Sequence, residues 1–323
     1  MIDLIDKMNH AFLFQVHKEP ELLNRILTHL DASNHFYAIN VDGKSRVKNE
    51  LDDIIKKHPN VVHVTHDPIS YGGFSIVICT IKQLKCLMNS NHNICYYHTL
   101  SGQDYPCVSN YVFDSWFERN SPKSFLMIDT DEQAEEWQNS VYAPRMEQWD
   151  FSDSLQGPLS RKLHLIGLQR RLTKFIKRPC SFLPEIRGGW NWWSLNKDTA
   201  YFLIDYFDKD PKYLRRFDHT FCSDELVFTT VLHKYRDQLQ LEEFNSLRYV
   251  EWNPIREYSS LPLVLRETEY DDIVHSGALF CRKVSLDESC KLLDLLDLRI
   301  KEMNPEMIPE QNPKLPYLIN NYC

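Results

Sequence analysis

The first hundred residues alternate between strand-like and helix-like segments, and this alternation limits the possible folds more than any other feature. Apolar runs typical of strands cover residues 10–17, 35–42, 60–64 and 93–100. Apolar residues at helical spacing fill the stretches between them, at 19–30, 45–57 and 74–88. Strands separated by helices run parallel, so the pattern predicts an α/β fold with a mostly parallel central sheet flanked by helices.

Polar residues follow three of these predicted strands, where parallel sheets bind their ligands. They are His17 and Lys18 after the first strand, Asp42 and Lys44 after the second, and residues 101–106 after the fourth. The chain has only nine glycines, and neither a G-x-G-x-x-G nor a G-x-x-x-x-G-K-[ST] motif occurs. Bound phosphates are therefore expected to meet lysine and arginine side chains rather than a glycine-rich backbone loop.

Composition narrows the partners and the compartment. The net charge is −8, from 37 basic and 45 acidic residues, which argues against a general nucleic-acid binder. No apolar run approaches the roughly 18 residues of a membrane span, and the acidic N-terminus does not resemble a secretory signal. Nine cysteines form no C-x-x-C pair and no zinc-type spacing, so we expect free thiols and no metal site. These features predict a cytoplasmic protein.

Seven segments of the chain form an ordered series of motifs. They include "VHKEPELLNRILTHLDASNHFYAINVDGKS", "YGGFSIVICTIKQL", "LSGQDYP", "GGWNWWSLNKDTAYFL", "CSDELVFTTVL", "LRYVEW" and "ALFCRKVS". Together they extend from about residue 10 to residue 286. They resemble the core-2/I-branching β-1,6-N-acetylglucosaminyltransferases, a family that also includes the peptide O-xylosyltransferases.

This resemblance implies a GT-A-like nucleotide-sugar transferase fold and an inverting reaction that needs no metal ion and no cofactor. A UDP-sugar, with GlcNAc or xylose as the sugar, would be the donor, and a hydroxyl of a glycan or glycolipid would be the acceptor. Animal members are anchored Golgi proteins with disulfides. The present chain instead resembles a short bacterial member, with an expected role in surface polysaccharide or glycoconjugate synthesis.

The resemblance also assigns roles to residues that composition alone leaves ambiguous. Glu225 would be the catalytic base, although in isolation it reads as a first-turn acid favoured by the helix dipole. Asp224 beside it would cap or orient, with Ser223 as the N-cap. By resemblance Lys283 binds the diphosphate. Its expected partner is Arg266, with Arg282 as the alternative.

Other candidates lie at the predicted strand ends and in the later motifs. Val16 and His17 would contact the nucleoside. Asp42 would do so as well, unless it only caps the turn before "GKS". Asp104 is either a wall of the site or a turn-stabilising residue. Trp252 either stacks on the acceptor sugar or belongs to the core.

Three rival interpretations stay open. Asp129 and Asp131 form an Asp-x-Asp pattern by which many GT-A enzymes hold a metal ion. A basic amphipathic stretch at 160–179 either packs its apolar side on the domain, which we favour, or touches an anionic membrane at the inner face of the cell. The chain could also be a non-catalytic protein that binds nucleotide or glycan with the same fold.

The expected organisation is one domain with two functional halves. Residues 1–125 would bind the nucleotide sugar, and residues 126–288 would supply the acceptor site, the base and the diphosphate cations. Residues 289–323 would form a C-terminal tail, whose prolines disfavour a long terminal helix. The tryptophan-rich segment 190–193 is expected to be a strand with at least one buried indole.

Overall fold

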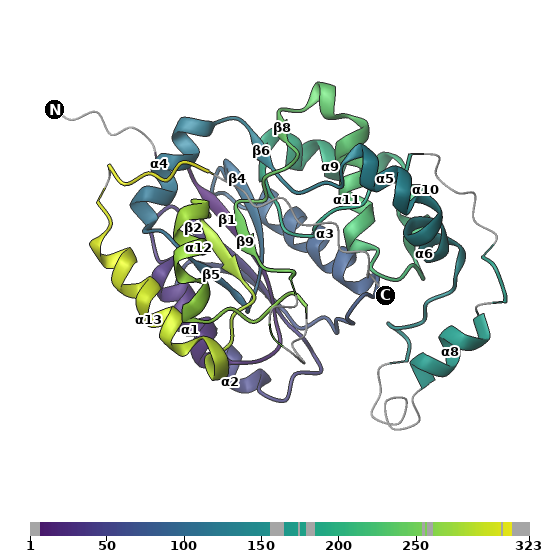
Figure 1. The fold of residues 1–323 in the computed structure, drawn as a ribbon, viewed down its shortest axis with the longest axis horizontal. Helices are drawn as coiled ribbons and strands as arrows, with labels where there is room; N and C mark the ends of the chain where they lie inside the picture. Colours follow the sequence, from purple (N-terminus) through teal and green to yellow (C-terminus); the bar gives the residue numbers. More distant parts are fainter. Residues whose placement is uncertain are drawn as a thin grey trace.

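The computed structural model describes residues 7–155, 165–173, 175–178, 185–253, 256, 261–304 and 306–311. Its main sheet has seven strands in the order β3-β2-β1-β4-β7-β6-β8 (Figure 1). Their bounds are β1 His10–Val16, β2 His35–Val41, β3 Val61–Thr65, β4 Tyr96–Ser101, β6 Ser124–Phe125, β7 Ser194–Asn196 and β8 Leu241–Glu242. The four predicted strands are β1 to β4, and all four run parallel, as the alternation predicted.

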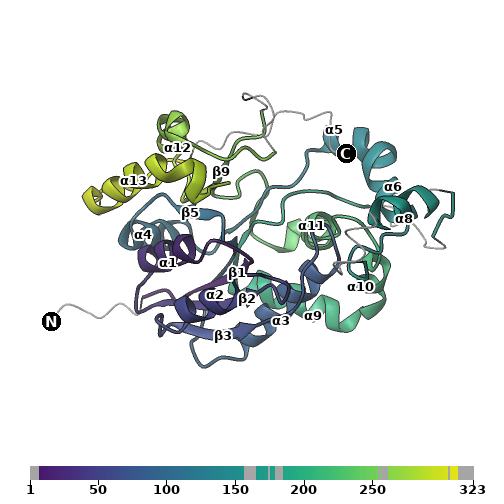
Figure 2. The same cartoon turned by 90° about the horizontal axis from the view of Figure 1, so that it is seen from below.

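Helices cover both faces of this sheet, which explains why its central strands are continuously apolar. Phe12 and Phe14 of β1 pack in one core cluster, and Ala11 and Leu13 pack in the other. In Figure 2 α1, α4, α12 and α13 lie on the side opposite α3 and α9. The predicted α/β class, with a mostly parallel sheet flanked by helices, is therefore confirmed.

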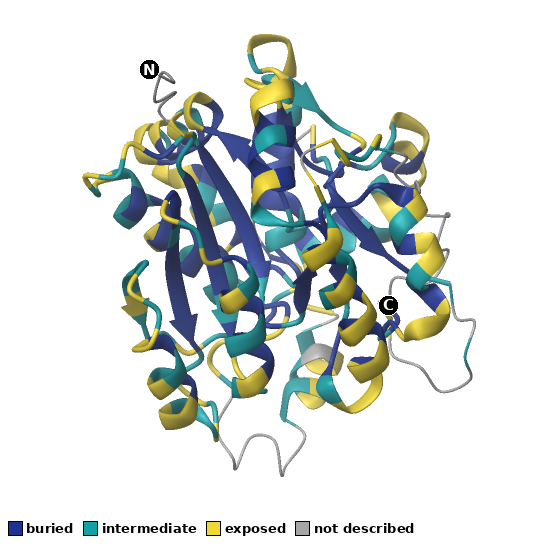
Figure 3. Cartoon of the chain, turned by 90° about the vertical axis from the view of Figure 1, so that its left-hand side faces the viewer, coloured by how far each residue is buried: buried dark blue, intermediate teal, exposed yellow. Residues whose placement is uncertain are grey.

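The helices that form these layers vary widely in length. Their bounds are α1 Pro20–His29, α2 Lys48–Ile55, α3 Ser75–Met88, α4 Asn110–Asn120, α5 Asp131–Trp137, α6 Ala143–Glu147, α8 Leu165–Thr173, α9 Lys197–Lys209, α10 Pro211–Phe217, α11 Asp224–Lys234, α12 Tyr270–Ser276 and α13 Leu286–Glu302. A π-helical turn, Gln138–Tyr142, joins α5 to α6. Figure 3 shows that the central strands are buried while the helices expose their outer faces; β3 and β8, at the edges of the sheet, are only partly buried.

A second sheet of three short strands connects distant parts of the chain. It contains β5 Asp104–Pro106, β9 Arg248–Val250 and β10 Phe280–Arg282, in the order β5-β10-β9. Strand β10 is parallel to β9 and antiparallel to β5. This sheet brings residue 104 beside residue 282, so the expected nucleotide half and catalytic half are structurally interleaved.

Several local expectations are corrected. The tail does not begin at residue 289, because Leu292, Leu293 and Leu296 of α13 are buried in the core. Residues 190–193 are not a strand, although Trp193 is fully buried as expected. Ser223 stands at the N-cap of α11 but makes no capping hydrogen bond through its side chain.

The basic stretch 160–179 is described only at residues 165–173 and 175–178. The favoured expectation, that its apolar side packs on the domain, is wrong for the described side chains. Leu168, Leu172, Phe175 and Ile176 are more than half exposed. The helix is attached instead by polar residues.

Two further properties can be stated for the described part of the chain. Seven cysteines at positions 79, 86, 95, 107, 222, 281 and 290 are free thiols. Within the same ranges, every helix is too short or too polar to cross a lipid bilayer.

Candidate active site

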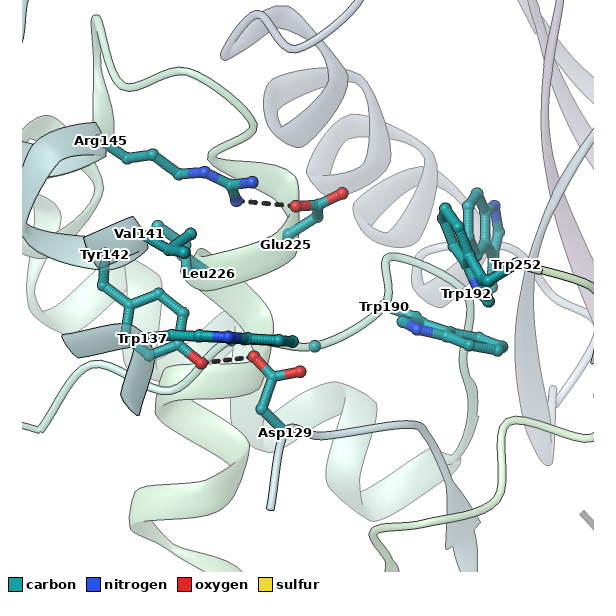
Figure 4. A pocket seen from close by; sticks show the side chains of 12 residues that line it. Asp129, Trp137, Val141, Tyr142, Arg145, Trp190, Trp192, Glu225, Leu226 and Trp252 are labelled. Atoms are coloured by element: carbon teal, nitrogen blue, oxygen red, sulfur yellow. Dashed lines mark hydrogen bonds and ion pairs between the residues drawn. The ribbon is translucent and has the colours of Figure 1, made fainter. Parts of the chain in front are cut away.

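A pocket at the start of α11 gathers charged and aromatic side chains from four separate segments (Figure 4). Glu225 and Leu226 come from α11, and Arg145 comes from α6. The remaining lining residues are Asp129, Trp137, Val141, Tyr142, Gly188, Gly189, Trp190, Trp192 and Trp252. We call this cavity the tryptophan pocket.

Glu225 is the acid expected to act as a base, and it faces this pocket. Nη1 of Arg145 donates a 2.8 Å hydrogen bond to Oε2 of Glu225, and the two side chains form an ion pair. Figure 4 shows the other carboxylate oxygen directed to the side on which Trp192 and Trp252 lie. The ion pair fixes the orientation of the carboxylate, which is one requirement of a general base.

Asp224 lies behind Glu225 and has a different environment. Burial, followed by the negative charge of Glu225, raises the pKa of Asp224 well above its usual range. Its carboxyl group is buried, so Glu225 rather than Asp224 is presented to the cavity. This placement is compatible with the orienting role expected for Asp224.

Asp129 brings a second carboxyl group to the tryptophan pocket. Burial raises the pKa of Asp129 to about 6, while the hydrogen bond from the Tyr142 hydroxyl opposes the shift. Glu225 raises this pKa further and Arg145 lowers it, so the three charges share one electrostatic environment. The pocket can therefore present both a charged and a protonatable carboxyl group to a polar ligand.

The Asp-x-Asp interpretation requires Asp129 and Asp131 to face one metal ion. Asp131 instead forms a 2.9 Å ion pair with Arg187, and its side chain is 85% exposed. It lines a separate groove with His233 and Arg236, whereas Asp129 lines the tryptophan pocket. Among the described residues, no group of three or more His, Cys, Asp or Glu side chains could hold a metal ion.

The three tryptophans of the pocket form a packed aromatic wall. The rings of Trp190 and Trp252 have centroids 6.0 Å apart, and those of Trp190 and Trp192 are 6.2 Å apart. Trp252 comes two residues after β9 and lines the pocket. It packs in a small apolar cluster separate from the two main cores. Aromatic faces of this kind suit the apolar face of a sugar ring.

Arg282 packs against one member of this wall, Trp192. Its guanidinium carbon lies 3.4 Å from the ring centroid of Trp192. Its Nη1 donates to both carboxylate oxygens of Asp104, at 3.1 and 3.0 Å. Both residues are buried, so Arg282 is engaged by Asp104 and Asp104 has a supporting position beneath the site.

The next residue, Lys283, lies in a group of cations at the carboxyl ends of β1 and β2. We call His17, Lys18, Lys44 and Lys283 the cation group. Burial, followed by the charges of Lys18 and Arg282, lowers the pKa of Lys283. Burial also lowers the pKa of His17, and the charges of Lys18, Lys283 and Lys44 act in the same direction. A bound anion would relieve this mutual repulsion.

Arg266 is next to Lys283 in space. The backbone N–H of Leu265 donates to the carbonyl of Lys283 at 2.8 Å. Arg266 forms an exposed 2.5 Å ion pair with Glu288, whose charge also acts on Lys283. Arg266 is therefore the more exposed of the two arginine candidates, and Arg282 is the one whose charge acts on Lys283.

The remaining nucleoside candidates have different exposures. Asp42 lies at the edge of the cation group, where its Oδ1 accepts from the backbone N–H groups of Lys44 and Ile69. This is the capping arrangement considered from the sequence, and it leaves Oδ2 within 3.7 Å of the Lys44 ammonium. Val16 is 2% exposed, so its side chain belongs to the core.

Sequence reasoning missed the charge that pairs with Glu225. Arg145 occurs in "YAPRM", where no motif marks it, and it lies 80 residues before its partner. Asp129 was singled out only as a metal ligand, and Trp190 and Trp192 only as strand residues. The unusual density of tryptophans in "WNWW" was the one available signal.

A parallel α/β sheet with cations at its carboxyl edge, beside a carboxylate in an aromatic pocket, is typical of enzymes that transfer sugars from nucleotides. A sequence model of the family described as "Core-2/I-Branching enzyme" matches residues 10–269. The chain therefore belongs to the core-2/I-branching enzyme family. Members of this family use nucleotide-sugar donors and glycan acceptors.

Individual relatives are more distant. The chain is similar to the human and pig proteins named "Probable beta-1,3-galactosyl-O-glycosyl-glycoprotein beta-1,6-N-acetylglucosaminyltransferase 7". Each is 25% identical over 118 residues, which cover 34% of this chain. The chain thus spans about a quarter of these relatives, 27% of the human protein and 28% of the pig protein.

A solved structure, that of mouse xyloside xylosyltransferase 1 in its apo form, is also similar to this chain. Its TM-score is 0.36 at 10% sequence identity, and the match covers 76% of this chain and 88% of the mouse chain.

Proposed function

We propose that this chain is a glycosyltransferase, which inverts the anomeric carbon of a UDP-sugar and moves the sugar to a hydroxyl of a glycan. The observation that carries the proposal is the placement of Glu225. Its carboxylate faces the tryptophan pocket and is held there by Arg145 at 2.8 Å. The aromatic wall would hold an acceptor sugar against the one carboxylate oxygen that Arg145 does not bind.

In the reaction, Glu225 takes the proton of the acceptor hydroxyl as its oxygen attacks the anomeric carbon. A bond forms between the acceptor oxygen and that carbon, while the bond from the carbon to the diphosphate oxygen breaks. The electron pair leaves with UDP, which then carries one more negative charge. Lys283 and Arg266 stabilise this developing charge without a metal ion.

The two groups of residues are joined by β10 and its neighbours. Arg282 supports Trp192 of the tryptophan pocket, and the adjacent Lys283 belongs to the cation group. Trp252 follows β9, which pairs with β10. Donor diphosphate and acceptor sugar would therefore bind on either side of the same short sheet. GlcNAc and xylose are the proposed donor sugars, and the acceptor would belong to a surface polysaccharide or glycoconjugate.

A donor screen tests this proposal. The protein would be mixed with UDP-GlcNAc, UDP-xylose, UDP-glucose or UDP-galactose, and the melting temperature would be measured because a ligand that binds only the folded state raises it. We expect one of the first two sugars to give the largest increase and to be hydrolysed slowly when no acceptor is present. Binding without any hydrolysis or transfer would indicate a non-catalytic binding protein instead.

The role of metal is tested in the same assay. Activity should persist in EDTA, because lysine and arginine side chains balance the charge of the departing diphosphate. Complete loss in EDTA, with recovery on addition of Mn²⁺, would contradict the proposal and favour a metal site that includes Asp129.

A further inference from the structure

Helix α8 presents an apolar stripe to solvent. Leu168, Leu172, Phe175 and Ile176 are 51, 61, 87 and 61% exposed. Leu168 and Leu172 are four residues apart on one face of α8, and Phe175 and Ile176 come shortly after its last residue, Thr173; we call these four side chains the apolar stripe. Figure 1 shows α8 projecting from the body of the molecule. Single exposed apolar residues are ordinary, but four on one stripe indicate a binding surface.

The polar residues of the same helix attach it to the protein. Gln169 donates a 2.6 Å hydrogen bond to the carbonyl of Trp149 and accepts one from the backbone N–H of Phe151. Thr173 donates to the same carbonyl at 3.2 Å. The helix therefore contacts the rest of the protein through polar side chains and exposes its apolar stripe, whereas a surface helix usually does the opposite.

Two hydrogen bonds and one ion pair fix the end of the segment that follows α8. Arg178 is buried and donates to the Thr220 hydroxyl at 2.7 Å and to the carbonyl of Arg216 at 2.9 Å. Lys177 forms a 2.5 Å ion pair with Glu147, the last residue of α6. These contacts hold the apolar stripe in place while leaving its side chains exposed.

The charge of the stretch identifies the occupant. Between residues 160 and 179 the sequence has seven basic residues and no acid, although the whole chain has a net charge of −8. Of these, Arg171 and Lys177 are described as exposed beside the apolar stripe. A second copy docked symmetrically would bring two such basic stretches together, which is unfavourable.

We propose that α8 docks the protein on an anionic lipid surface, with Leu168, Leu172, Phe175 and Ile176 in the headgroup region and Arg171 against the lipid phosphates. Apolar insertion and attraction to anionic lipids act together in helices of this kind. Helix α6, which carries Arg145 into the tryptophan pocket, is next to this surface through Glu147. If the proposed function holds, the acceptor is then a glycan linked to lipid; the docking itself does not depend on transfer.

Vesicle sedimentation with the full chain tests the docking without any measurement of activity. The vesicles would be phosphatidylcholine alone, or phosphatidylcholine with about one third of anionic phosphatidylglycerol. We expect wild-type protein to sediment with the anionic vesicles and more weakly with the neutral ones, and added salt should weaken binding.

Two variants separate the apolar and electrostatic contributions. Leu172→Ser with Phe175→Ser should lower the affinity for anionic vesicles at least about tenfold, because two exposed side chains no longer insert. Arg171→Glu should lower it about tenfold and reduce the salt dependence. Tyr111→Ser is the matched control, since Tyr111 is 58% exposed on α4, far from α8 in Figure 1. Circular dichroism would verify that each variant is folded.

Three results would overturn the proposal. They are a wild-type protein that stays in the supernatant with anionic vesicles at low salt, folded variants that bind as well as wild type, or loss of binding by Tyr111→Ser alone. Light scattering tests the remaining alternative, in which the apolar stripe binds a second copy of the chain. A wild-type dimer that the double variant dissociates, without vesicle binding, would assign the stripe to a second copy of the chain.

Discussion

The tryptophan pocket and the cation group differ in how their charges are partnered. In the pocket, the negative charge of Glu225 is neutralised by Arg145 within 2.8 Å, and Asp129 is held by Tyr142. In the cation group, burial and then the charges of Lys18 and Arg282 lower the pKa of Lys283, while Glu19 and Glu288 oppose the shift. The carboxylate of Glu225 thus has a close cationic partner in the pocket, whereas several cations of the cation group act on one another and would be stabilised by a bound anion. This difference supports separate tasks, proton removal in one region and diphosphate binding in the other.

The strongest way to break this comparison is the substitution Glu225→Gln. It removes the base without changing the shape of the pocket, so transfer should fall by about 10²–10⁴-fold while UDP affinity is retained. Transfer would be followed by UDP release, and affinity by calorimetry. Glu242→Gln, a substitution at an exposed residue paired with Lys123, is the control. Near-normal turnover of Glu225→Gln would remove the proposed base.

Burial of acids in the pocket should also make stability depend on pH. Because the fold raises the pKa of Asp129 from 3.8 to about 6, the folded state binds this proton more tightly than the unfolded state. Its contribution is therefore most favourable below about pH 4 and is lost as pH rises through about 6, by about 2–3 kcal/mol.

The variant Asp129→Asn isolates this effect. Relative to wild type, it should be about 2–3 kcal/mol more stable at pH 7 than at pH 4, as measured by urea unfolding at both values. Asp131→Asn is the matched control, because Asp131 is exposed. An equal pH dependence in wild type and Asp129→Asn would show that this carboxyl group is not buried as described.

The cation group is tested by Lys283→Ala. Loss of a charged contact to the diphosphate should weaken UDP binding by about 10- to 100-fold in calorimetry. Lys291→Ala, at an exposed lysine of α13 paired with Glu267, should leave the affinity unchanged. Unaltered UDP binding by Lys283→Ala would mean that the phosphates bind elsewhere.

The smallest effect is expected for Trp252→Ala, which tests the acceptor side of the comparison. Trp252→Ala removes one face of the aromatic wall, so the KM for acceptor should rise by up to about tenfold while UDP affinity is unchanged. Initial rates at varied acceptor concentration would measure the change. A fall in UDP affinity with an unchanged acceptor KM would place Trp252 on the donor side.

The fold was more predictable than the site, for a physical reason. Strands β1 and β2 are buried on both faces, so their sequences are continuous apolar runs that can be recognised directly. Strands β9 and β10 are only three residues long, which is too short for any periodicity. Their position depends on β5, about 140 residues or more away in the sequence.

The residues of the site also differ in whether a local sequence motif marks them. Glu225 and Lys283 could be proposed as site residues because each lies in a segment that resembles a family motif. Arg145 could not be found, because its importance comes only from a contact across 80 residues. The pairing of Arg282 with Asp104 was unpredictable for a related reason, since the two residues are 178 positions apart in the sequence. Pairwise contacts of this kind leave no local signal in one sequence.

A crystal structure of the protein with bound UDP tests the central claim most directly. The account predicts that the pyrophosphate contacts the Lys283 ammonium at the carboxyl end of β1, with no metal ion bound to it, and that the tryptophan pocket stays free for the acceptor. A pyrophosphate bound in the tryptophan pocket against Arg145, or bridged by a cation to Asp129, would contradict it.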